Sequence, residues 1–213
     1  MTIQRIAIIG AGGHATVVAS AIIASGNEVV GFYADPPESW GSKIFGVPVW
    51  GPVSELSSKS CSHAIVAIGD NAARKRISSA IDMDWATVVH PFSWVHPDVP
   101  LGEGTIVCAG AIIQPGSRVG SHVILNTKAS VDHHCQVGDY AHITLAHLAG
   151  GASIDEGVFM ALGCTVLPKI HIGAWATVGP GAVARKNVPP HTTVVGNPAR
   201  SFHEMRHQRN RED

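Results

Sequence analysis

The sequence lacks three features that would narrow its function at once: an excess of charge of either sign, a long apolar run, and a pair of closely spaced cysteines. Its 213 residues carry a formal net charge of -1 at pH 7, so no broad basic field favours nucleic acid or a membrane surface. The apolar run near the N-terminus is too short to span a membrane, and we find no signal-peptide cleavage site after it. We therefore expect no nucleic-acid partner, no membrane insertion and a cytoplasmic location.

The second half of the chain has a regular six-residue period of aliphatic side chains. The aliphatic positions are Val95, Leu101, Val107, Ile113, Val119, Leu125, Val131, Val137, Ile143, Leu148, Ile154, Met160, Val166, Ile172 and Val178. A second, mostly small residue follows four places after nearly every aliphatic, as Ala111, Ala129 and Ala141 illustrate. Cys135 and Cys164 occupy this small position, where a thiol acts as a small hydrophobe, and we expect reduced cysteines.

This period is typical of a parallel β-helix in which three six-residue rungs close one coil of eighteen residues. Glycines recur between the aliphatics and supply the turns that such a coil needs. One step is irregular, because Ile143 and Leu148 are five residues apart and not six. The missing residue predicts one short coil, in which local side chains are re-aimed as they are at a bulge, unless a tolerant turn absorbs the change.

The first 88 residues follow a different pattern, which predicts a small α/β domain with a parallel sheet. Strands are expected over residues 3–9, 28–33 and 63–68, a short strand near 47–50, and helices after the glycine turn at 10–15 and over 72–81. We accordingly divide the chain into an α/β domain (1–88), a β-helix domain (89–200) and a C-terminal tail (201–213).

The glycine turn contains Gly10, Gly12 and Ala15, which match the spacing of a dinucleotide-binding fingerprint. Asp35 lies 22 residues after Gly13, near where an acid that binds ribose is expected. Glycines let the backbone approach a phosphate, and the helix that follows offers free N–H groups at its positive end. Since about ninety residues are too few for two nucleotide-binding halves, a ligand with a single nucleotide fits best.

Together, the GAGGH turn, the hexapeptide repeat and the closing VVGNPAR segment resemble the NeuD/PglD-type family of sugar acetyltransferases. The resemblance covers nearly the whole chain and is most specific at residues 10–14, 69–71 and 126–150. It implies a left-handed β-helix, an exception to the usual crossover rule, assembled as a homotrimer. It also implies a nucleotide-sugar on the α/β domain and acetyl-CoA, with no metal, in the groove between neighbouring β-helices.

By this resemblance, the catalytic histidine of the family falls on His133, in an outward turn two places after Val131. The role implied is that of a general base. His134 stands where family members usually have Glu or Asp to orient that histidine. The orienting group is then Asp132 or an acid from elsewhere in the trimer, or His133 works without a carboxylate. Gly150 matches the residue whose N–H meets the thioester oxygen, and His142 matches a histidine near the thioester.

The remaining site residues also follow from the resemblance. The nucleotide-sugar is expected at Gly12, Gly13, His14, Asp35, Gly69, Asp70 and Asn71. Acetyl-CoA is expected at His142, Gly150, Lys186, Asn197, Pro198 and Arg200.

The activity expected is transfer of acetyl from acetyl-CoA to the amine of a nucleotide-linked amino-sugar, in particular a 4-amino-4,6-dideoxy sugar for a surface glycan such as O-antigen. Acetylation of a hydroxyl, as in sialic acid O-acetyltransferases, is the alternative on the same scaffold. Two other classes stay open: a γ-carbonic-anhydrase-like zinc trimer using His142 and His147, and a regulatory nucleotide-binding module on an inert scaffold. The nucleotide base is not readable from the sequence.

Overall fold

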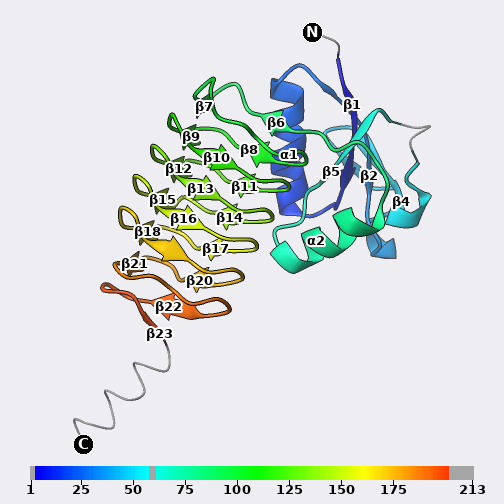
Figure 1. Cartoon of the computed structure of the whole chain (residues 1–213). Coiled ribbons are helices and arrows are strands. Elements are labelled where there is room, and N and C mark those ends of the chain that lie inside the picture. The colour runs from blue at the N-terminus through cyan, green and yellow to red at the C-terminus, as the bar shows by residue number, and fades with distance from the viewer. Residues whose placement is uncertain (1–2, 58–60, 202–213) are drawn as a thin grey trace, which may run out of the picture.

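The computed structural model describes residues 3–57 and 61–201, which form an α/β unit packed against the side of a long β-helix (Figure 1). The predicted tail therefore lies, from residue 202 on, outside the described residues. Among the residues described, no helix is long and apolar enough to cross a membrane.

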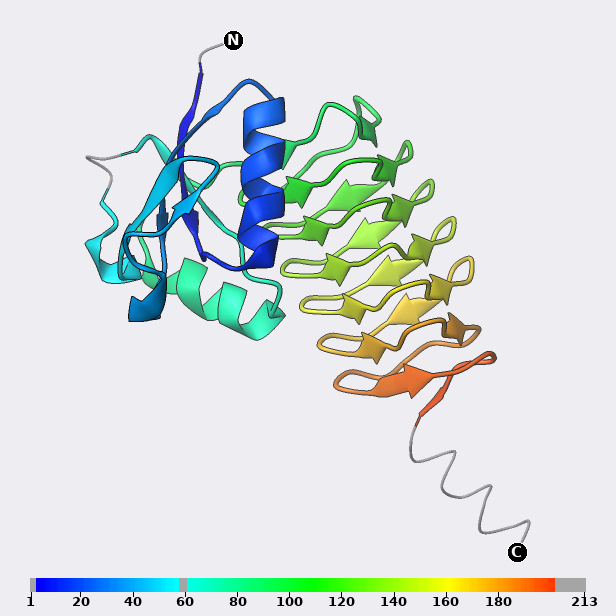
Figure 2. The ribbon, with the colours of Figure 1, turned by 180° about the vertical axis from the view of Figure 1, so that it is seen from behind.

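The α/β unit is a five-stranded sheet in the order β3-β4-β2-β1-β5. Its strands are β1 (Arg5–Ile9), β2 (Glu28–Tyr33), β3 (Lys43–Ile44), β4 (Val47–Gly51) and β5 (His63–Val66). All pair in parallel except β3, which runs antiparallel to β4. The helices are α1 (Gly13–Ala24) and α2 (Asn71–Ala80), with short 3-10 turns at η1 (Pro37–Ser39) and η2 (Val53–Glu55). Seen from behind, α1 lies between this sheet and the coils of the β-helix (Figure 2).

The β-helix has three faces, each a stack of very short strands. The first face holds β6 (Val88–Val89), β8 (Ile106–Val107), β11 (Ile124–Leu125), β14 (His142–Ile143), β17 (Phe159–Met160), β20 (Thr177–Val178), β22 (Thr193–Val195) and β23 (Arg200–Ser201). The second face holds β7 (Trp94–Val95), β9 (Ile112–Ile113), β12 (Ser130–Val131), β15 (His147–Leu148), β18 (Thr165–Val166) and β21 (Val183–Ala184). The third face holds β10 (Arg118–Val119), β13 (Gln136–Val137), β16 (Ser153–Ile154) and β19 (His171–Ile172).

Pairing between coils confirms the coil length and the short step predicted from the sequence. Ile124 pairs with Ile106 and with His142, each eighteen residues away, whereas His142 pairs with Phe159, seventeen residues on. The missing residue is absorbed at the corner between the first and second faces, where Leu145 has φ of 32°. Because parallel pairing continues on all three faces, the short coil leaves the register of the strands around it intact.

The core of the β-helix consists of the aliphatic and small side chains that define the hexad. The first face also carries apolar side chains on its outer surface, since Ile106 and Ile124 are buried against the α/β unit. The two units therefore share a core, and the boundary predicted after residue 88 falls inside β6, which already pairs with β8. Burial of these two isoleucines, each about 1.5–3 kcal/mol, favours a fixed arrangement of the units.

Large rings stack along the corner between the third and first faces. His122 and Tyr140 lie parallel, with ring centroids 5.2 Å apart, and both have positive φ. Gly157 occupies the next coil at this corner, and a Cβ built on it would lie 2.5 Å from the ring of Trp175. Glycine is needed at position 157 because the indole ring of Trp175 fills the space that a Cβ would occupy.

We predict that Gly157→Ala destabilises the protein more than Gly163→Ala. Both glycines have φ near +70°, so both alanines carry the cost of a left-handed conformation, about 1–2 kcal/mol. Only at position 157 does the methyl group also collide with a ring, since nothing lies within 4 Å of a Cβ at Gly163. Urea unfolding of the two variants measures the difference, and equal losses of unfolding free energy would contradict the steric argument.

Candidate functional site

A cleft of about 590 Å³ opens in the α/β unit at the ends of strands β1, β2 and β5. Its lining includes Gly10, Gly12, His14, Asp35 and Gly69, so it brings together four of the residues predicted to bind the nucleotide-sugar. The site lies beyond the carboxyl ends of parallel strands, where ligands bind in open α/β sheets.

The glycine turn shapes one end of this cleft. Gly10 has φ of +116°, and a Cβ on it would lie 3.0 Å from the carbonyl oxygen of Ala67, so only glycine fits between β1 and β5. Gly12 is the N-cap of α1 and Gly13 its first residue, and nothing lies within 4 Å of a Cβ at either. The first turn of α1 contains no acidic residue. The end of α1 is therefore open and positive, which suits a phosphate.

His14 and His142 meet at the junction of the cleft with the β-helix, with ring centroids 6.1 Å apart. Burial, and secondarily the charge of Arg74, lowers the pKa of His14 to about 4. His14 Nε2 is buried and has no hydrogen-bond partner among the described residues. A neutral imidazole with an unused nitrogen thus faces the region where the cleft meets β14.

The hydrogen bonds of His142 fix its proton. Its Nδ1 donates to the carbonyl oxygen of Gly69 (3.2 Å), and its Nε2 accepts from the Asn126 amide (3.2 Å). Burial is the largest cause that lowers the pKa of His142 to about 4, and the charges of Arg74 and His14 act in the same direction. His142 is thus a neutral link between the Gly69 loop of the cleft and the first face of the β-helix.

A second cluster lies at the corner between the second and third faces, where the chain passes from β12 to β13. His133 and His134 are both exposed, and their Nδ1 atoms are 3.0 Å apart. Gly150 holds the equivalent position one coil further on, and a Cβ there would lie 2.6 Å from His133 Nε2. The structure therefore brings together His133, His134 and Gly150, with Nε2 of His133 over Gly150.

The backbone N–H of Gly150 is distinctive at this corner. Three of the equivalent positions in other coils are prolines, which have no N–H: Pro97, Pro115 and Pro168. The N–H of His133 donates to Asp132 Oδ1 (2.7 Å), whereas that of Gly150 donates to no other described residue. A free donor beside an imidazole is the arrangement needed to stabilise an oxyanion.

Other predicted nucleotide residues have structural partners. Asp35 lines the cleft, and its Oδ1 accepts from the N–H of Val53 (3.0 Å). Asp70 does not line the cleft and instead caps α2, accepting from the N–H of Ala73 (2.7 Å). Asn71 is buried, and its amide donates to the carbonyl oxygen of Gly157 (3.0 Å) on the β-helix.

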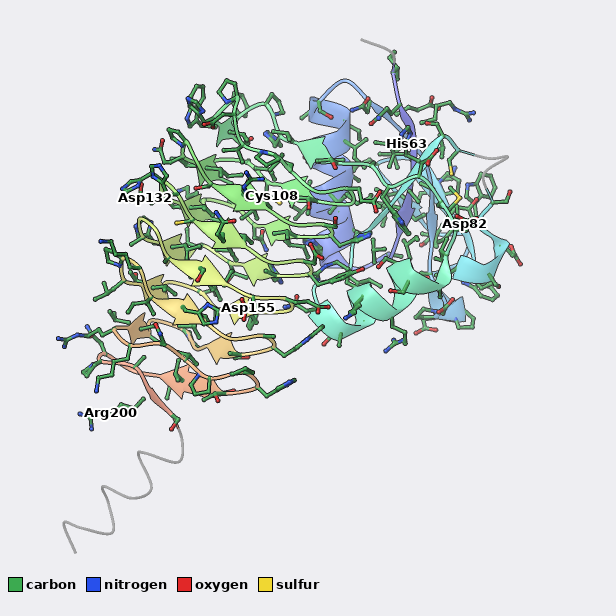
Figure 3. All side chains as sticks on the ribbon, viewed as in Figure 1. His63, Asp82, Cys108, Asp132, Asp155 and Arg200 are labelled. Atoms are coloured by element: carbon green, nitrogen blue, oxygen red, sulfur yellow. The ribbon has the colours of Figure 1, made fainter. Side chains whose placement is uncertain are left out.

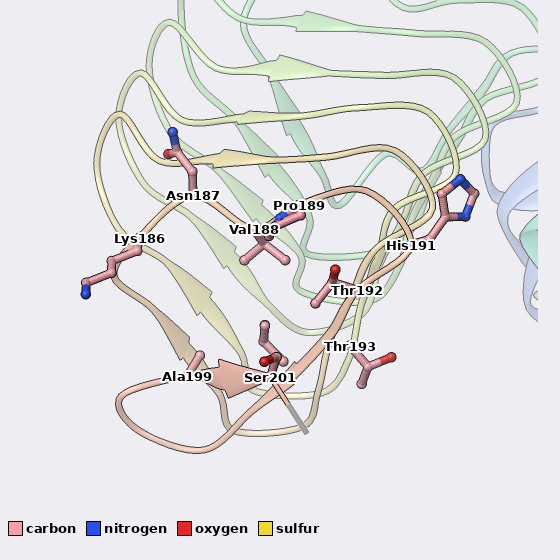
Figure 4. Close-up of a pocket in the computed structure, with 10 residues that line it drawn as sticks. Lys186, Asn187, Val188, Pro189, His191, Thr192, Thr193, Ala199 and Ser201 are labelled. Atoms are coloured by element: carbon pink, nitrogen blue, oxygen red, sulfur yellow. The ribbon is translucent and has the colours of Figure 1, made fainter. Parts of the chain in front are cut away.

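The residues predicted to bind the far end of acetyl-CoA lie at the C-terminal end of the β-helix. Lys186 lines a pocket of about 510 Å³ there, together with Asn187, His191 and Thr193 (Figure 4). Asn197, Pro198 and Arg200 are exposed in the hairpin that joins β22 to β23. His133 lies in the same column of corner positions as Lys186, but His142 lies on the first face, away from that column.

Sequence reasoning missed the residues that join the two units. Arg74, Tyr140 and Lys75 connect α2 to the β-helix, and nothing in the hexad or in the helical pattern marks them. Asn126, which directly follows β11, is a further such residue, because its amide holds His142. From the sequence, Arg74 looks like any other charged residue of the polar helix α2.

The zinc alternative finds no support in the geometry. His142 lies on the first face and His147 on the second, so the two side chains project from different sides of a coil. Over residues 3–57 and 61–201, no group of three or more His, Cys, Asp or Glu side chains is placed to hold a metal ion.

Comparison with known proteins identifies several similar chains. The PglD N-terminal domain family matches residues 5–81, which cover the α/β unit. PerB from Caulobacter crescentus, solved with CoA and GDP-perosamine, is 35% identical with a TM-score of 0.87, covering 94% of this chain and 98% of that chain. The acetyltransferase domain of PglB from Neisseria gonorrhoeae, solved with acetyl coenzyme A, is 34% identical with a TM-score of 0.86, covering 94% and 100%.

A curated relative, the GDP-perosamine N-acetyltransferase of Escherichia coli O157:H7, is 34% identical over 147 residues. The match covers 64% of this chain and 66% of that enzyme, and the chain spans less of several other curated relatives. Likeness over nearly the full length of solved chains confirms the predicted fold, an α/β unit followed by a left-handed parallel β-helix.

The lowered pKa values of the buried histidines predict a loss of stability in acid. His14 and His142 have folded pKa values of about 4, below the 6.5 of an unfolded histidine, so the unfolded chain binds more protons between these values. Stability is therefore complete above pH 6.5 and falls by about 2–4 kcal/mol for each of the two histidines as the pH drops toward 4. Urea unfolding at pH 7 and pH 4.5 measures this loss.

The matched variants are His142→Gln, which removes one buried imidazole, and His191→Gln, which replaces an exposed one. We expect the acid-induced loss to be smaller in His142→Gln than in the wild type, and unchanged in His191→Gln. An equal loss in all three proteins would show that His142 is not held neutral.

Proposed function

The chain belongs to the NeuD/PglD-type family of sugar acetyltransferases, and on this premise we propose that it transfers acetyl from acetyl-CoA to the amine of a nucleotide-linked amino-sugar. The observation that carries the proposal is His133 Nε2 over Gly150, on a chain that also has a nucleotide-sized cleft. The acceptor we propose is a 4-amino-4,6-dideoxy sugar destined for a surface glycan such as O-antigen. GDP is the first nucleotide to test, because PerB was solved with GDP-perosamine.

The chemistry follows from the cluster at the corner. The sugar amine attacks the thioester carbonyl, and His133 Nε2 accepts the proton that the amine loses. The carbonyl oxygen becomes negative in the tetrahedral intermediate, and the free N–H of Gly150 is placed to donate to it. Collapse of the intermediate breaks the C–S bond, and His133 returns the proton as CoA leaves as a thiol.

His134 supplies the orienting contact that an acid supplies elsewhere in the family. For Nε2 of His133 to accept a proton, its ring proton must sit on Nδ1, which then donates to Nδ1 of His134 (3.0 Å). His134 in turn carries its proton on Nε2, which faces Gly116, where a Cβ would lie 3.1 Å away. Asp132 Oδ1 accepts from the backbone N–H of His133, and the ring of His133 bonds instead to the ring of His134.

The cleft and His133 of one chain lie on different sides of the β-helix. Asp132, next to His133, is on the edge of the β-helix away from the α/β unit (Figure 3), whereas His142 beside the cleft bonds to Gly69 of that unit. A sugar held in the cleft therefore needs the His133 of another copy. This supports the homotrimer that we propose, with active sites between neighbouring subunits.

Acetyl-CoA is proposed to run along the column of corner positions that begins at His133. Lys186 lies three coils further on, about 14 Å at the usual strand spacing of about 4.8 Å. Its ammonium is exposed and would meet a phosphate of CoA, with Asn197, Pro198 and Arg200 of the terminal hairpin nearby. His142, held between Gly69 and Asn126, would contact the thioester only across a subunit boundary.

The nucleotide is proposed to place its phosphates at Gly12, Gly13 and His14 and its ribose at Asp35. Gly69 forms the opposite wall of the cleft. Asp70 and Asn71 support that wall through their hydrogen bonds to Ala73 and Gly157. A cytoplasmic location is part of the proposal, because all four cysteines are buried and no disulfide joins them within the described residues.

We predict that His133→Ala lowers kcat about 10²–10⁴-fold in a CoA-release assay with nucleotide-linked 4-amino sugars, because the general base is lost. Binding of GDP or UDP should not change, since His133 is outside the cleft. His63→Ala, at the start of β5, is the control and should keep the wild-type rate. A His133→Ala variant as active as wild type would exclude the proposed base, and release of CoA with sialic acid alone would identify a hydroxyl acceptor.

The role of His134 is tested by two variants that tolerate its φ of 58°. His134→Gly removes the acceptor of the His133 proton without strain, and we expect kcat to fall about tenfold with little change in KM. His134→Asn keeps an acceptor oxygen in a residue that adopts this backbone conformation, so most of the rate should return. If glycine and asparagine gave the same kcat, the hydrogen bond to His134 would have no part in the reaction.

A further inference from the structure

Arg74 is the largest fully buried side chain of the described residues, with 1% of its surface exposed. It lies on α2, yet its guanidinium reaches out of the α/β unit. Its Nε donates to the carbonyl oxygen of His122 (2.8 Å), and Nη2 donates to that of Tyr140 (2.7 Å), both on the β-helix. Nη1 donates to the carbonyl oxygen of Ile68 (2.9 Å), in the loop after β5.

No carboxylate forms an ion pair with Arg74 within the described ranges. Carbonyl oxygens and the Asn71 amide oxygen (2.9 Å) take that place. Burial is the largest cause that lowers the pKa of Arg74 to about 10, so the guanidinium remains charged at neutral pH. A buried cation without a carboxylate is costly, and a role limited to holding two units together would be met equally well by apolar side chains.

The loop that Arg74 holds is a wall of the nucleotide cleft. Ile68 and Gly69 both line it, while Arg74 itself does not. His142 holds this loop from the other side, because its Nδ1 donates to the carbonyl oxygen of Gly69. The wall is thus fixed by groups that are anchored on the β-helix, and the charge of Arg74 lies directly behind it.

Building on the proposed function, we propose that Arg74 is a positioning residue of the nucleotide cleft. It fixes the Ile68–Gly69 wall against the β-helix and places a buried positive charge behind the site of the diphosphate, without touching the nucleotide. The residues predicted to bind the nucleotide have neither of these two roles. Both roles affect binding of the nucleotide and not of acetyl-CoA.

Lys75 is the matched control, because it is the next residue of α2 and bridges the same junction. Its ammonium pairs with Glu156 and lies 5.8 Å and 5.6 Å from the ring centroids of Tyr140 and Trp175. It neither contacts the Ile68–Gly69 wall nor lines the cleft. A variant of Lys75 therefore weakens the contact between the units while leaving the wall in place.

The experiment compares Arg74→Gln, Arg74→Lys and Lys75→Met in the full chain. Titration calorimetry gives the Kd values of GDP, UDP, guanosine and CoA, and thermal unfolding gives Tm. We expect Arg74→Gln to weaken binding of the preferred nucleoside diphosphate about tenfold or more and guanosine less, with CoA unchanged. Arg74→Lys, which keeps the charge but not the fork of donors, should lie between Arg74→Gln and wild type. Lys75→Met should lower Tm but keep wild-type Kd values.

Two results would overturn the proposal: equal loss of nucleotide binding in Arg74→Gln and Lys75→Met, or equal loss of CoA and nucleotide binding in Arg74→Gln. Either would reduce Arg74 to a contact between units. If Arg74→Gln does not fold, Arg74→Lys takes its place in the comparison with Lys75→Met. Equal loss of nucleotide binding in these two variants would then overturn the proposal. Failure of the wild-type protein to bind GDP or UDP would instead refute the proposed function.

Discussion

The parallel pairing of one coil with the next is the constraint on which the remaining structure depends. Each strand of the β-helix bonds to strands of the adjacent coils, eighteen residues away in most coils, seventeen across the short coil and sixteen at the last coil. Residues at one corner therefore form a column with a spacing set by the backbone. The side chain at one position of a column then determines what its neighbour in the next coil can be. His133 and Gly150 are such a pair, and the unbroken register across the short coil is what aligns them.

The proposed catalytic pair, His133 and Gly150, follows the same steric rule as the scaffold. Gly104 lies against the His122 ring, Gly116 against that of His134 and Gly157 against that of Trp175, and in each case a Cβ on the glycine would collide with the ring. A bulky side chain in one coil is therefore matched by a glycine in an adjacent coil. At Gly150 this rule has a chemical consequence, because the glycine that makes room for an imidazole also exposes a backbone N–H. The packing of the coils is therefore sufficient to place the N–H donor of Gly150 beside the imidazole of His133.

Most of the architecture was readable from the sequence because it is periodic. The hexad predicted the core of the β-helix, and every small inward position named from it is buried, Cys135 and Cys164 included. The glycine turn and Asp35 were predicted to meet, and they line one cleft, because the ends of parallel strands converge. Contacts between the units were not readable. Arg74 bonds to Tyr140 and Asn71 bonds to Gly157 over long sequence separations, and these contacts repeat nowhere, so neither period nor spacing marks them. The resemblance placed His142 near the thioester, but only the structure reveals its bonds to Gly69 and Asn126.

The junction between the units also sets the electrostatics of the cleft. Arg74 lowers the pKa of His14, His122 and His142, in addition to the larger effect of their burial, and all three values fall to about 4. The region behind the cleft therefore carries the positive charge of Arg74, with Asp70 acting on it, and several neutral imidazoles. Protonating these histidines would place like charges around a guanidinium that has no carboxylate partner, and the low pKa values keep this from happening near neutral pH. The open N-terminus of α1 adds to the same potential from the opposite side of the cleft. The charge of these groups stays constant over the physiological pH range, whereas the proton transfers that we propose take place at the exposed histidines of the far corner.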